Sequence, residues 1–144
     1  MNLYLDTSAL IKRYISETGT EDVRAWIRAA EAISLSIMTR AETAAGLTRL
    51  QSRGILTQEN YMTALEQFRL DWEWYQRLPI NEELIARADF LACQHGLRGY
   101  DAVHLAAALV WQEALTLPVT LATYDQELAD AGKKSGLKVL PKII

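Results

Sequence analysis

The sequence has 144 residues, of which 50% are hydrophobic and 23% are charged, and its net charge is −3. This length and composition predict one folded domain, residues 1–144, and exclude an intrinsically disordered protein. The lone cysteine, Cys93, excludes an internal disulfide and a cysteine-based zinc site, which favours a reducing, cytoplasmic compartment.

The sequence predicts no association with a membrane. The N-terminus lacks the basic region and the apolar core of a signal peptide. The longest apolar run, 105–111, is far shorter than the roughly 18 residues of a membrane span. The negative charge is only a weak argument against nucleic-acid binding, because acids that hold a metal ion no longer repel phosphate.

Strand and helix patterns alternate along the whole chain. We expect strands at 2–6, 33–37, 75–80, 119–122 and 137–140, and helices at 8–14, 20–30, 39–53, 57–72, 81–95, 101–114 and 126–132. Thr20, Thr39 and Thr57 are the candidate N-caps of their helices. Strands separated by helices of this length predict a three-layer α/β domain with a five-stranded, mainly parallel sheet flanked by helices.

Four acids lie where a predicted strand gives way to a helix. Asp6 ends the first strand, Glu42 and Asp101 open helices, and Asp125 follows the fourth strand. The carboxyl ends of parallel strands meet at one edge of a sheet, so these side chains are expected to converge. Four carboxylates without a lysine beside them repel one another, and a divalent cation such as Mg²⁺ relieves that repulsion. The sequence therefore predicts an acidic metal site that could act on phosphate.

Each acid also has a purely structural explanation. Asp6 and Asp125 suit N-caps, and Asp101 suits the positive end of a helix dipole. Glu42 suits the capping box of Thr39. His104, three residues after Asp101, is either a ligand or proton shuttle, or a residue that packs beside the helix or hydrogen-bonds a neighbouring strand.

Other catalytic classes lack support in the sequence. It contains no Ser-His-Asp order, no glycine-rich phosphate loop and no CxxC motif. A phospho-acceptor receiver domain needs an acid at the end of its third strand, and this chain has Leu78-Pro79-Ile80-Asn81 there. A phosphatase with Asp6 as nucleophile needs an acid two residues later, where the chain has Ser8.

Four segments carry a resemblance to a known family: YLDTSALIK at 4–12, RAE at 40–42, HGLRGYDAVHLA at 95–106 and ATYD at 122–125. With these segments the chain resembles the PIN-domain family, and within it the VapC-type toxins of bacterial toxin–antitoxin pairs. The first and third segments are specific, whereas the second and fourth are short.

The resemblance implies a five-stranded parallel sheet, a Mg²⁺ or Mn²⁺ site, endoribonuclease activity on RNA, inhibition by a cognate VapB-type antitoxin, and homodimerisation. It assigns the metal site to Asp6, Glu42, Asp101 and Asp125, with Thr123 as an auxiliary residue. Thr7 and His104 are further auxiliary candidates. The alternative is a non-catalytic PIN-like or receiver-like metal-binding module.

Two further expectations concern contacts with other molecules. Lys12, Arg40 and Arg98 lie close in sequence to the acids and are candidate ligands of RNA phosphates. Trp72, Trp74 and Tyr75 point in different directions from one helix end, so some of them should be exposed or lie in an interface.

Overall fold

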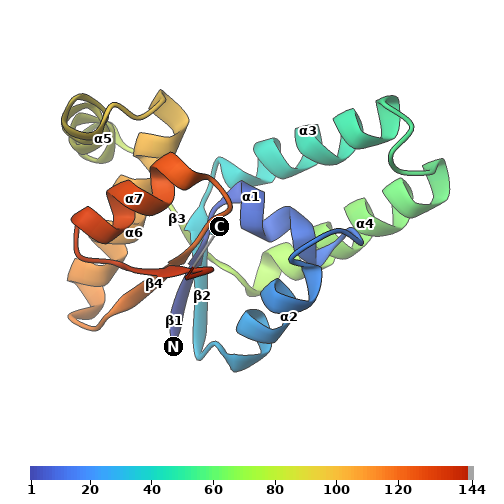
Figure 1. Cartoon of the computed structure of the whole chain (residues 1–144), viewed down its shortest axis with the longest axis horizontal. Helices are drawn as coiled ribbons and strands as arrows, with labels where there is room; N and C mark the ends of the chain where they lie inside the picture. The colour runs from blue at the N-terminus through green and yellow to red at the C-terminus, as the bar shows by residue number, and fades with distance from the viewer. Residues whose placement is uncertain (143–144) are drawn as a thin grey trace.

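The computed structural model describes residues 1–142 and contains one five-stranded sheet at its centre (Figure 1). The strands, in the spatial order β3-β2-β1-β4-β5, are all parallel. Their bounds are Asn2–Leu5 (β1), Ala32–Ser36 (β2), Gln76–Leu78 (β3), Val119–Ala122 (β4) and Lys138–Leu140 (β5). The predicted α/β class, five-stranded sheet and parallel order are confirmed.

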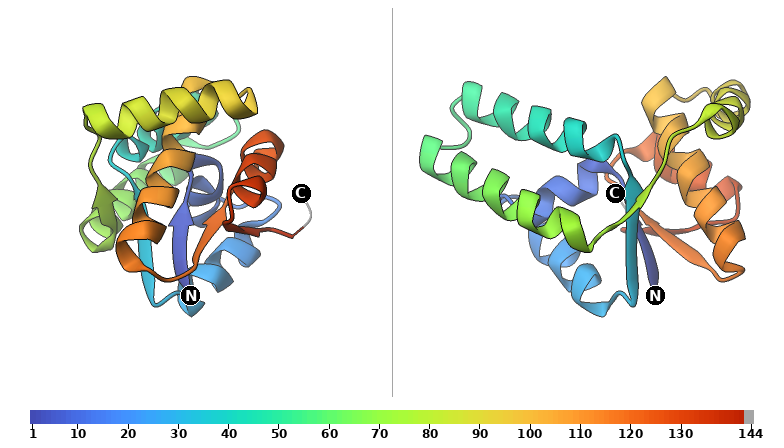
Figure 2. Two further views of the ribbon diagram at one scale, coloured as in Figure 1. Left: turned by 90° about the vertical axis from the view of Figure 1, so that its left-hand side faces the viewer. Right: turned by 180° about the vertical axis from the view of Figure 1, so that it is seen from behind.

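Helices cover both faces of this sheet, which gives the three layers seen in Figure 2. The helices are α1 (Thr7–Leu10), α2 (Thr20–Ala29), α3 (Thr39–Ser52), α4 (Gln58–Asp71), α5 (Glu82–His95), α6 (Gly99–Leu115) and α7 (Gln126–Lys134), with 3₁₀ turns η1 (Ile11–Arg13) and η2 (Trp72–Trp74). One apolar cluster joins the sheet to α5, α6 and α7, and a second joins it to α1, α3 and α4. Within residues 1–142, no helix is long and apolar enough to cross a bilayer.

The central strand β1 is buried on both faces, as expected for a strand inside a parallel sheet. Tyr4 belongs to the cluster under α6, whereas Leu3 and Leu5 belong to the opposite cluster. β1 pairs with β2 on one side and with β4 on the other, where Leu5 lies opposite Ala122. From β1 the chain adds β2 and β3 on one side of the sheet and then crosses over to add β4 and β5 on the other side. Open α/β sheets build their binding sites at such a change of direction, here between β1 and β4.

Helices α3 and α4 form an antiparallel pair that projects away from the sheet (Figures 1 and 2). Gly46 lets α3 approach η1 closely, because a Cβ at this position would come within 2.9 Å of the Ile11 side chain. The predicted N-cap of α4 is confirmed: the Thr57 hydroxyl accepts a hydrogen bond from the Asn60 amide at 3.1 Å.

Two predicted helix caps are wrong. Gly19, in the left-handed region at φ 92°, is the N-cap of α2, and the Thr20 hydroxyl instead donates to the Ile15 carbonyl. Met38 precedes α3, and Thr39 is a buried residue of its first turn that makes no capping bond. Position along the sequence suggested both caps, but burial of the two hydroxyls turns them away from the helix N-termini.

The aromatic residues after α4 diverge as predicted. The exposed fractions of Trp72 and Tyr75 are 3% and 7%, whereas that of Trp74 is 86%. Phe68 packs edge-on against Trp72, so one side of the helix end is core and the other faces solvent. The Trp74 ring is therefore free to contact another molecule.

Candidate acidic active site

All four predicted acids lie at elements that begin beyond the carboxyl ends of the strands. Asp6 directly follows β1 and is the N-cap of α1, and Asp125 follows β4 and is the N-cap of α7. Glu42 and Asp101 lie in the first turns of α3 and α6. Asp6 and Asp125 follow the neighbouring strands β1 and β4, so the strand order brings these two acids to the same edge of the sheet. Glu42 accepts a hydrogen bond from Thr7, next to Asp6, and Arg98 connects Asp101 to Asp125.

Asp6 is the most deeply buried of these acids, with 3% of its surface exposed. Its Oδ1 accepts hydrogen bonds from the Ser8 hydroxyl at 2.8 Å and the Ala9 amide at 2.9 Å, and its Oδ2 accepts one from Thr123 at 2.6 Å. Burial raises the pKa of Asp6 although these hydrogen bonds oppose the shift. Asp6 is thus a helix cap and a desolvated carboxylate whose two oxygens both accept hydrogen bonds.

Glu42 does not close a capping box. Its Oε1 accepts hydrogen bonds from the Thr7 hydroxyl at 2.8 Å and from His104 Nε2 at 2.9 Å. Partial burial is the largest single influence and would raise the pKa of Glu42, but the interactions with His104 and the hydrogen bond from Thr7 together outweigh it and hold the pKa below its ordinary value. The carboxylate is therefore directed toward the site by two other elements, α1 and α6.

Asp101 and Asp125 share one arginine. Arg98 Nε donates to Asp101 Oδ2 at 3.0 Å, and an Arg98 terminal nitrogen donates to Asp125 Oδ2 at 2.8 Å. Burial raises the pKa of Asp101, and the charge of Asp125 adds to this shift. The two carboxylates are thus close enough to repel each other and to share a cation, which here is a guanidinium group.

Thr123 connects two of the acids. Its hydroxyl donates to Asp6 and accepts a hydrogen bond from the backbone amide of Asp125 at 3.0 Å. Ser8, which the sequence did not single out, contacts Asp6 and also accepts a hydrogen bond from the Tyr124 amide at 2.8 Å. Its place two residues after Asp6, at the start of a helix, was the available signal.

The donor set suits a hard divalent cation, because it consists of carboxylate and hydroxyl oxygens. The positively charged guanidinium group of Arg98 lies between Asp101 and Asp125, so these two acids already bind one cation. In the described part of the chain, however, no three Asp, Glu, His or Cys side chains are close enough together to hold one ion. A metal ion bound by Asp101 and Asp125 therefore requires Arg98 to move, and binding by all four acids stays a prediction.

A groove of about 580 Å³ opens beside Glu42. It is lined by Thr7, Ser8, Ile11, Ala41, Glu42, Ala45, Gly46, Arg49 and Tyr100. Arg49 lies seven residues after Glu42, two helical turns along the same side of α3, and this spacing could have identified it. The groove thus places one of the four acids, Glu42, beside a cationic and an aromatic side chain.

The three predicted phosphate ligands differ in their surroundings. Lys12 donates to Glu17 and to the Thr18 carbonyl, both at 2.9 Å, and only 13% of its side chain is exposed. Its ammonium group also lies 4.4 Å from the centre of the Tyr124 ring. Lys12 therefore holds a loop together, whereas Arg40 and Arg98 are exposed.

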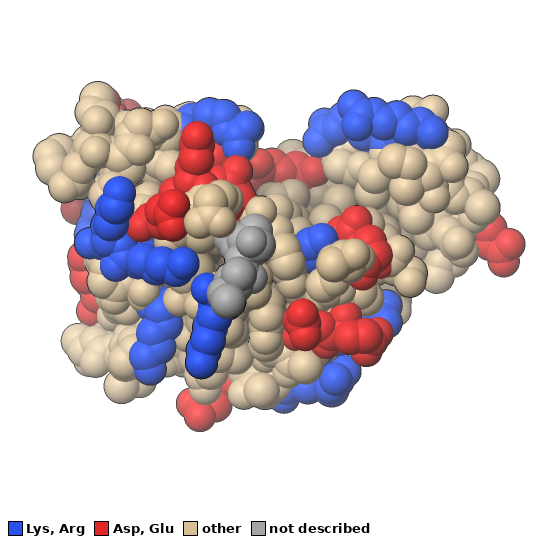
Figure 3. Space-filling model, in the orientation of Figure 1, with Lys and Arg blue, Asp and Glu red and all other residues tan. Residues whose placement is uncertain are grey.

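Figure 3 shows acidic side chains near the N-terminal ends of α6 and α7, with basic side chains beside them and further basic side chains over α3. Arg49 is the basic residue of the last turn of α3. The juxtaposition of acids and cations suits a substrate that carries negative charge, because the acids would be neutralised by a metal ion.

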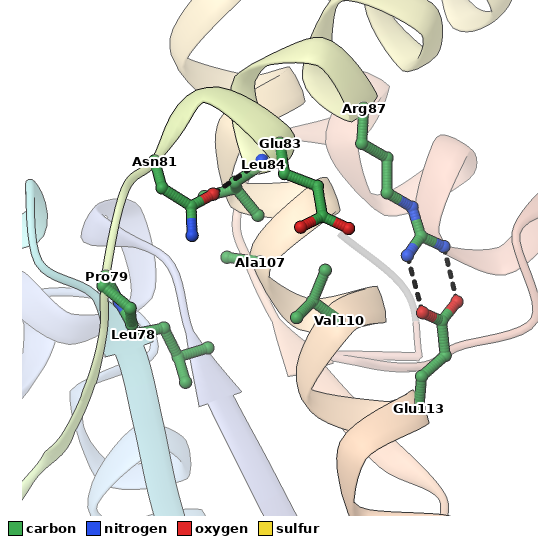
Figure 4. Close-up of a pocket in the computed structure, with 9 residues that line it drawn as sticks. All are labelled: Leu78, Pro79, Asn81, Glu83, Leu84, Arg87, Ala107, Val110 and Glu113. Atoms are coloured by element: carbon green, nitrogen blue, oxygen red, sulfur yellow. Dashed lines mark hydrogen bonds and ion pairs between the residues drawn. The ribbon is translucent and has the colours of Figure 1, made fainter.

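A second hollow, of about 370 Å³, lies between β3, α5 and α6 (Figure 4). The Arg87 guanidinium donates two hydrogen bonds to Glu113 at its edge, at 2.7 and 2.6 Å, and Leu78, Leu84 and Val110 are among the apolar lining residues. None of the predicted site residues lines this hollow. It is therefore separate from the acidic site.

Comparison with known proteins agrees with this geometry. The PIN domain family model matches residues 3–134. Ribonuclease VapC47 from Mycobacterium tuberculosis (strain CDC 1551 / Oshkosh) is 31% identical over 138 residues, which cover 93% of this chain and 92% of that protein. The chain therefore belongs to the PIN-domain family.

Two solved structures share the fold. PAE2754 from Pyrobaculum aerophilum matches with a TM-score of 0.67 and 20% identity, over 96% of this chain and 83% of that chain. A toxin–antitoxin complex from Klebsiella pneumoniae matches with a TM-score of 0.59 and 16% identity, over 82% of this chain and 83% of that chain. Within the PIN-domain family, the chain is thus similar to VapC ribonucleases and to a chain of a toxin–antitoxin complex.

Proposed function

We propose that the protein is a divalent-metal-dependent endoribonuclease and the toxin component of a VapBC-type toxin–antitoxin pair. The observation that carries the proposal is the arrangement of four acids from distant segments along one edge of the sheet, beside an open groove. The similarity to Ribonuclease VapC47 over nearly the full length of both chains supports it.

Asp6, Asp101, Asp125 and Glu42 would hold Mg²⁺ or Mn²⁺. A bound divalent ion polarises a phosphodiester and activates a water molecule as the nucleophile. The chain's own residues orient the reactants: Thr123 and Ser8 hold Asp6, while Thr7 and His104 hold Glu42. Arg40, Arg49 and Arg98 are the cations placed to contact the RNA backbone, which would give affinity without sequence specificity.

We also propose two protein partners, a cognate VapB-type antitoxin and a second copy of the chain. The toxin–antitoxin complex among the similar structures supports the first, and the exposed Trp74 ring is an anchor suited to either contact. Sedimentation of the protein alone and after co-expression with the product of the neighbouring gene tests both. A monomer that does not bind that product would contradict them.

Metal removal tests the proposed activity directly. We expect cleavage of a single-stranded RNA to stop in EDTA and to return with excess Mg²⁺ or Mn²⁺. Without the ion, the negative carboxylates of the site repel the negative phosphate of the RNA. Asp101→Asn should remain inactive when the ion is restored. Metal binding without cleavage of any RNA would favour the non-catalytic metal-binding module, and cleavage that persists in EDTA would contradict the proposal.

Replacement of Arg98 should have opposite effects on two ligands. In Arg98→Ala, we expect tighter Mn²⁺ binding, because Asp101 and Asp125 lose the guanidinium that neutralises them. We also expect weaker RNA binding. The slope of the logarithm of the binding constant against the logarithm of the salt concentration should decrease by about one, as for the loss of one phosphate contact. Calorimetry with Mn²⁺ and a salt titration of RNA binding, both on the same preparation, measure the two effects.

Arg87→Ala is the matched control, because Arg87 pairs with Glu113 at the second hollow. It should change neither quantity. Unaltered Mn²⁺ affinity in Arg98→Ala would show that the arginine does not compete with the metal ion.

A further inference from the structure

A chain of hydrogen bonds runs from the core of the sheet to the acidic site. The Tyr4 hydroxyl, on β1, lies 2.9 Å from Nδ1 of His104 on α6, and His104 Nε2 lies 2.9 Å from Oε1 of Glu42 on α3. The exposed fractions of Tyr4 and His104 are 0% and 2%, so no solvent competes for these bonds. Three elements distant in sequence thus meet at one imidazole ring.

The Glu42 end of this chain of hydrogen bonds determines where the imidazole proton lies. The Glu42 carboxylate is ionised and can only accept a hydrogen bond, so His104 Nε2 must donate one. The Nδ1 atom of a neutral imidazole is then an acceptor, and the Tyr4 hydroxyl is its donor. Burial, together with the charge of Asp6, raises the pKa of Tyr4, so this hydroxyl keeps its proton at neutral pH.

The same contacts leave the two oxygens of Glu42 in different environments. Thr7 and His104 both donate to Oε1, whereas Oε2 receives no hydrogen bond from residues 1–142. Two donors on a single oxygen fix the rotation of the carboxylate. The second oxygen is left for another ligand, and Glu42 itself lines the groove.

We propose that Tyr4 and His104 are positioning residues: Tyr4 holds the orientation of the His104 ring, and His104 fixes Glu42 so that its Oε2 is available to the divalent cation. This inference rests on the proposed metal-dependent function and assigns the residues that prepare its site. Hydrogen-bonding partners behind a ligand commonly tune metal affinity in this way. Neither Tyr4 nor His104 is assigned to bind the ion.

Removal of the Tyr4 hydroxyl should therefore change the position of the Glu42 carboxylate, although Tyr4 bonds His104 and not Glu42. In Tyr4→Phe the Nδ1 atom of His104 loses its hydrogen-bond partner, so nothing on β1 holds the rotation of the imidazole ring. The Nε2 donor is then no longer fixed against Oε1 of Glu42, and the carboxylate gains freedom to rotate. We expect the affinity for Mn²⁺ to fall by roughly 10–100-fold, the usual effect of losing such a partner.

The test compares Tyr4→Phe with Tyr61→Phe. Tyr61 is a control of the same chemistry, because its hydroxyl bonds Thr48 at 2.9 Å on the surface of the α3–α4 pair. Imidazole ¹⁵N spectra of the metal-free proteins report the hydrogen bonding of each ring nitrogen of His104, and calorimetry with Mn²⁺ alone reports affinity. Only Tyr4→Phe should change the spectrum and the affinity, with thermal melts showing that both variants fold.

A second pair of variants keeps the inference testable if Tyr4→Phe folds poorly. His104→Gln retains an N–H donor toward Glu42, and His104→Ala does not. We expect Gln to restore part of the Mn²⁺ affinity lost in Ala. Equal losses in the two variants, or a Tyr4→Phe protein with unchanged spectrum and affinity, would overturn the positioning role.

These results are separable from the proposed function. If the protein cleaves no RNA but Tyr4→Phe still weakens Mn²⁺ binding, the positioning role holds and the ribonuclease proposal fails. If metal-dependent cleavage is found and Tyr4→Phe behaves as the unaltered protein, only the positioning role fails.

Discussion

Asp6→Asn should reduce RNA cleavage by roughly 10²–10³-fold or more while the protein remains folded, because one charged group of the site is lost. The side chain keeps its volume, and an amide oxygen still accepts hydrogen bonds from Ala9 and Ser8, so the start of α1 is retained. What disappears is the negative charge nearest the core, which the divalent cation needs. Initial cleavage rates at saturating Mg²⁺ measure the effect.

The same substitution should alter the pH dependence of stability. The pKa of Asp6 is raised in the folded state, mainly by burial, so the folded protein binds the proton more tightly than the unfolded chain. The free energy of unfolding therefore falls as the pH rises from the unfolded pKa through the raised one. Asn does not titrate, so in EDTA the stability of Asp6→Asn relative to the unaltered protein should increase over that pH range.

Asp89→Asn is the matched control, since Asp89 is an exposed acid on α5. It should leave both cleavage and the pH profile unchanged. Added Mn²⁺ should raise the melting temperature of the unaltered protein and of Asp89→Asn, and should have little effect on Asp6→Asn. An Asp6→Asn protein that is unfolded would mean that Asp6 acts only as a helix cap.

Phe68→Ala should lower the free energy of unfolding by about 3–5 kcal/mol, as expected for removal of a buried phenylalanine. Phe68 is 1% exposed, and its ring packs edge-on against Tyr14 and Trp72 with centroids 5.5 and 5.7 Å away. These contacts join α4 to Tyr14, which follows η1, and to Trp72, at the start of the chain that leads to β3. Removal of the ring leaves a cavity in the second apolar cluster, and the cavity adds to the lost transfer free energy.

Urea unfolding in EDTA measures this loss without a contribution from bound metal. Leu70→Ala is the control on the same helix, because Leu70 is 61% exposed. It should change the free energy of unfolding by no more than about 0.5 kcal/mol. Similar losses in the two variants would show that α4 is not held by the contacts of Phe68.

The sequence alone determined the class of fold and the positions of the acids. The apolar strands β1 (Asn2–Leu5) and β4 (Val119–Ala122), each followed by an acid and a helix, are local features that a parallel sheet gathers on one edge. The N-caps at Asp6 and Asp125 were also foreseeable, because a cap depends on residues only three positions away.

The tertiary structure alone decided what surrounds each acid. The bond between Tyr4 and His104 joins residues 100 positions apart, and the one between His104 and Glu42 joins residues 62 apart. Such pairs depend on the order of the strands and on the face that each helix buries, which no local pattern encodes. The capping box at Thr39 was wrong for this reason, since Glu42 is held by partners on two other elements.

Charged residues show the same division. Lys12, Arg40 and Arg98 look alike in the sequence, because each lies a few residues from an acid. The fold places Lys12 against Glu17 and Tyr124, leaves Arg40 exposed, and sets Arg98 between Asp101 and Asp125. Electrostatic contacts depend on distance in space and on burial, so the sequence determined which charges are present and the tertiary structure decided which of them are free to bind a ligand.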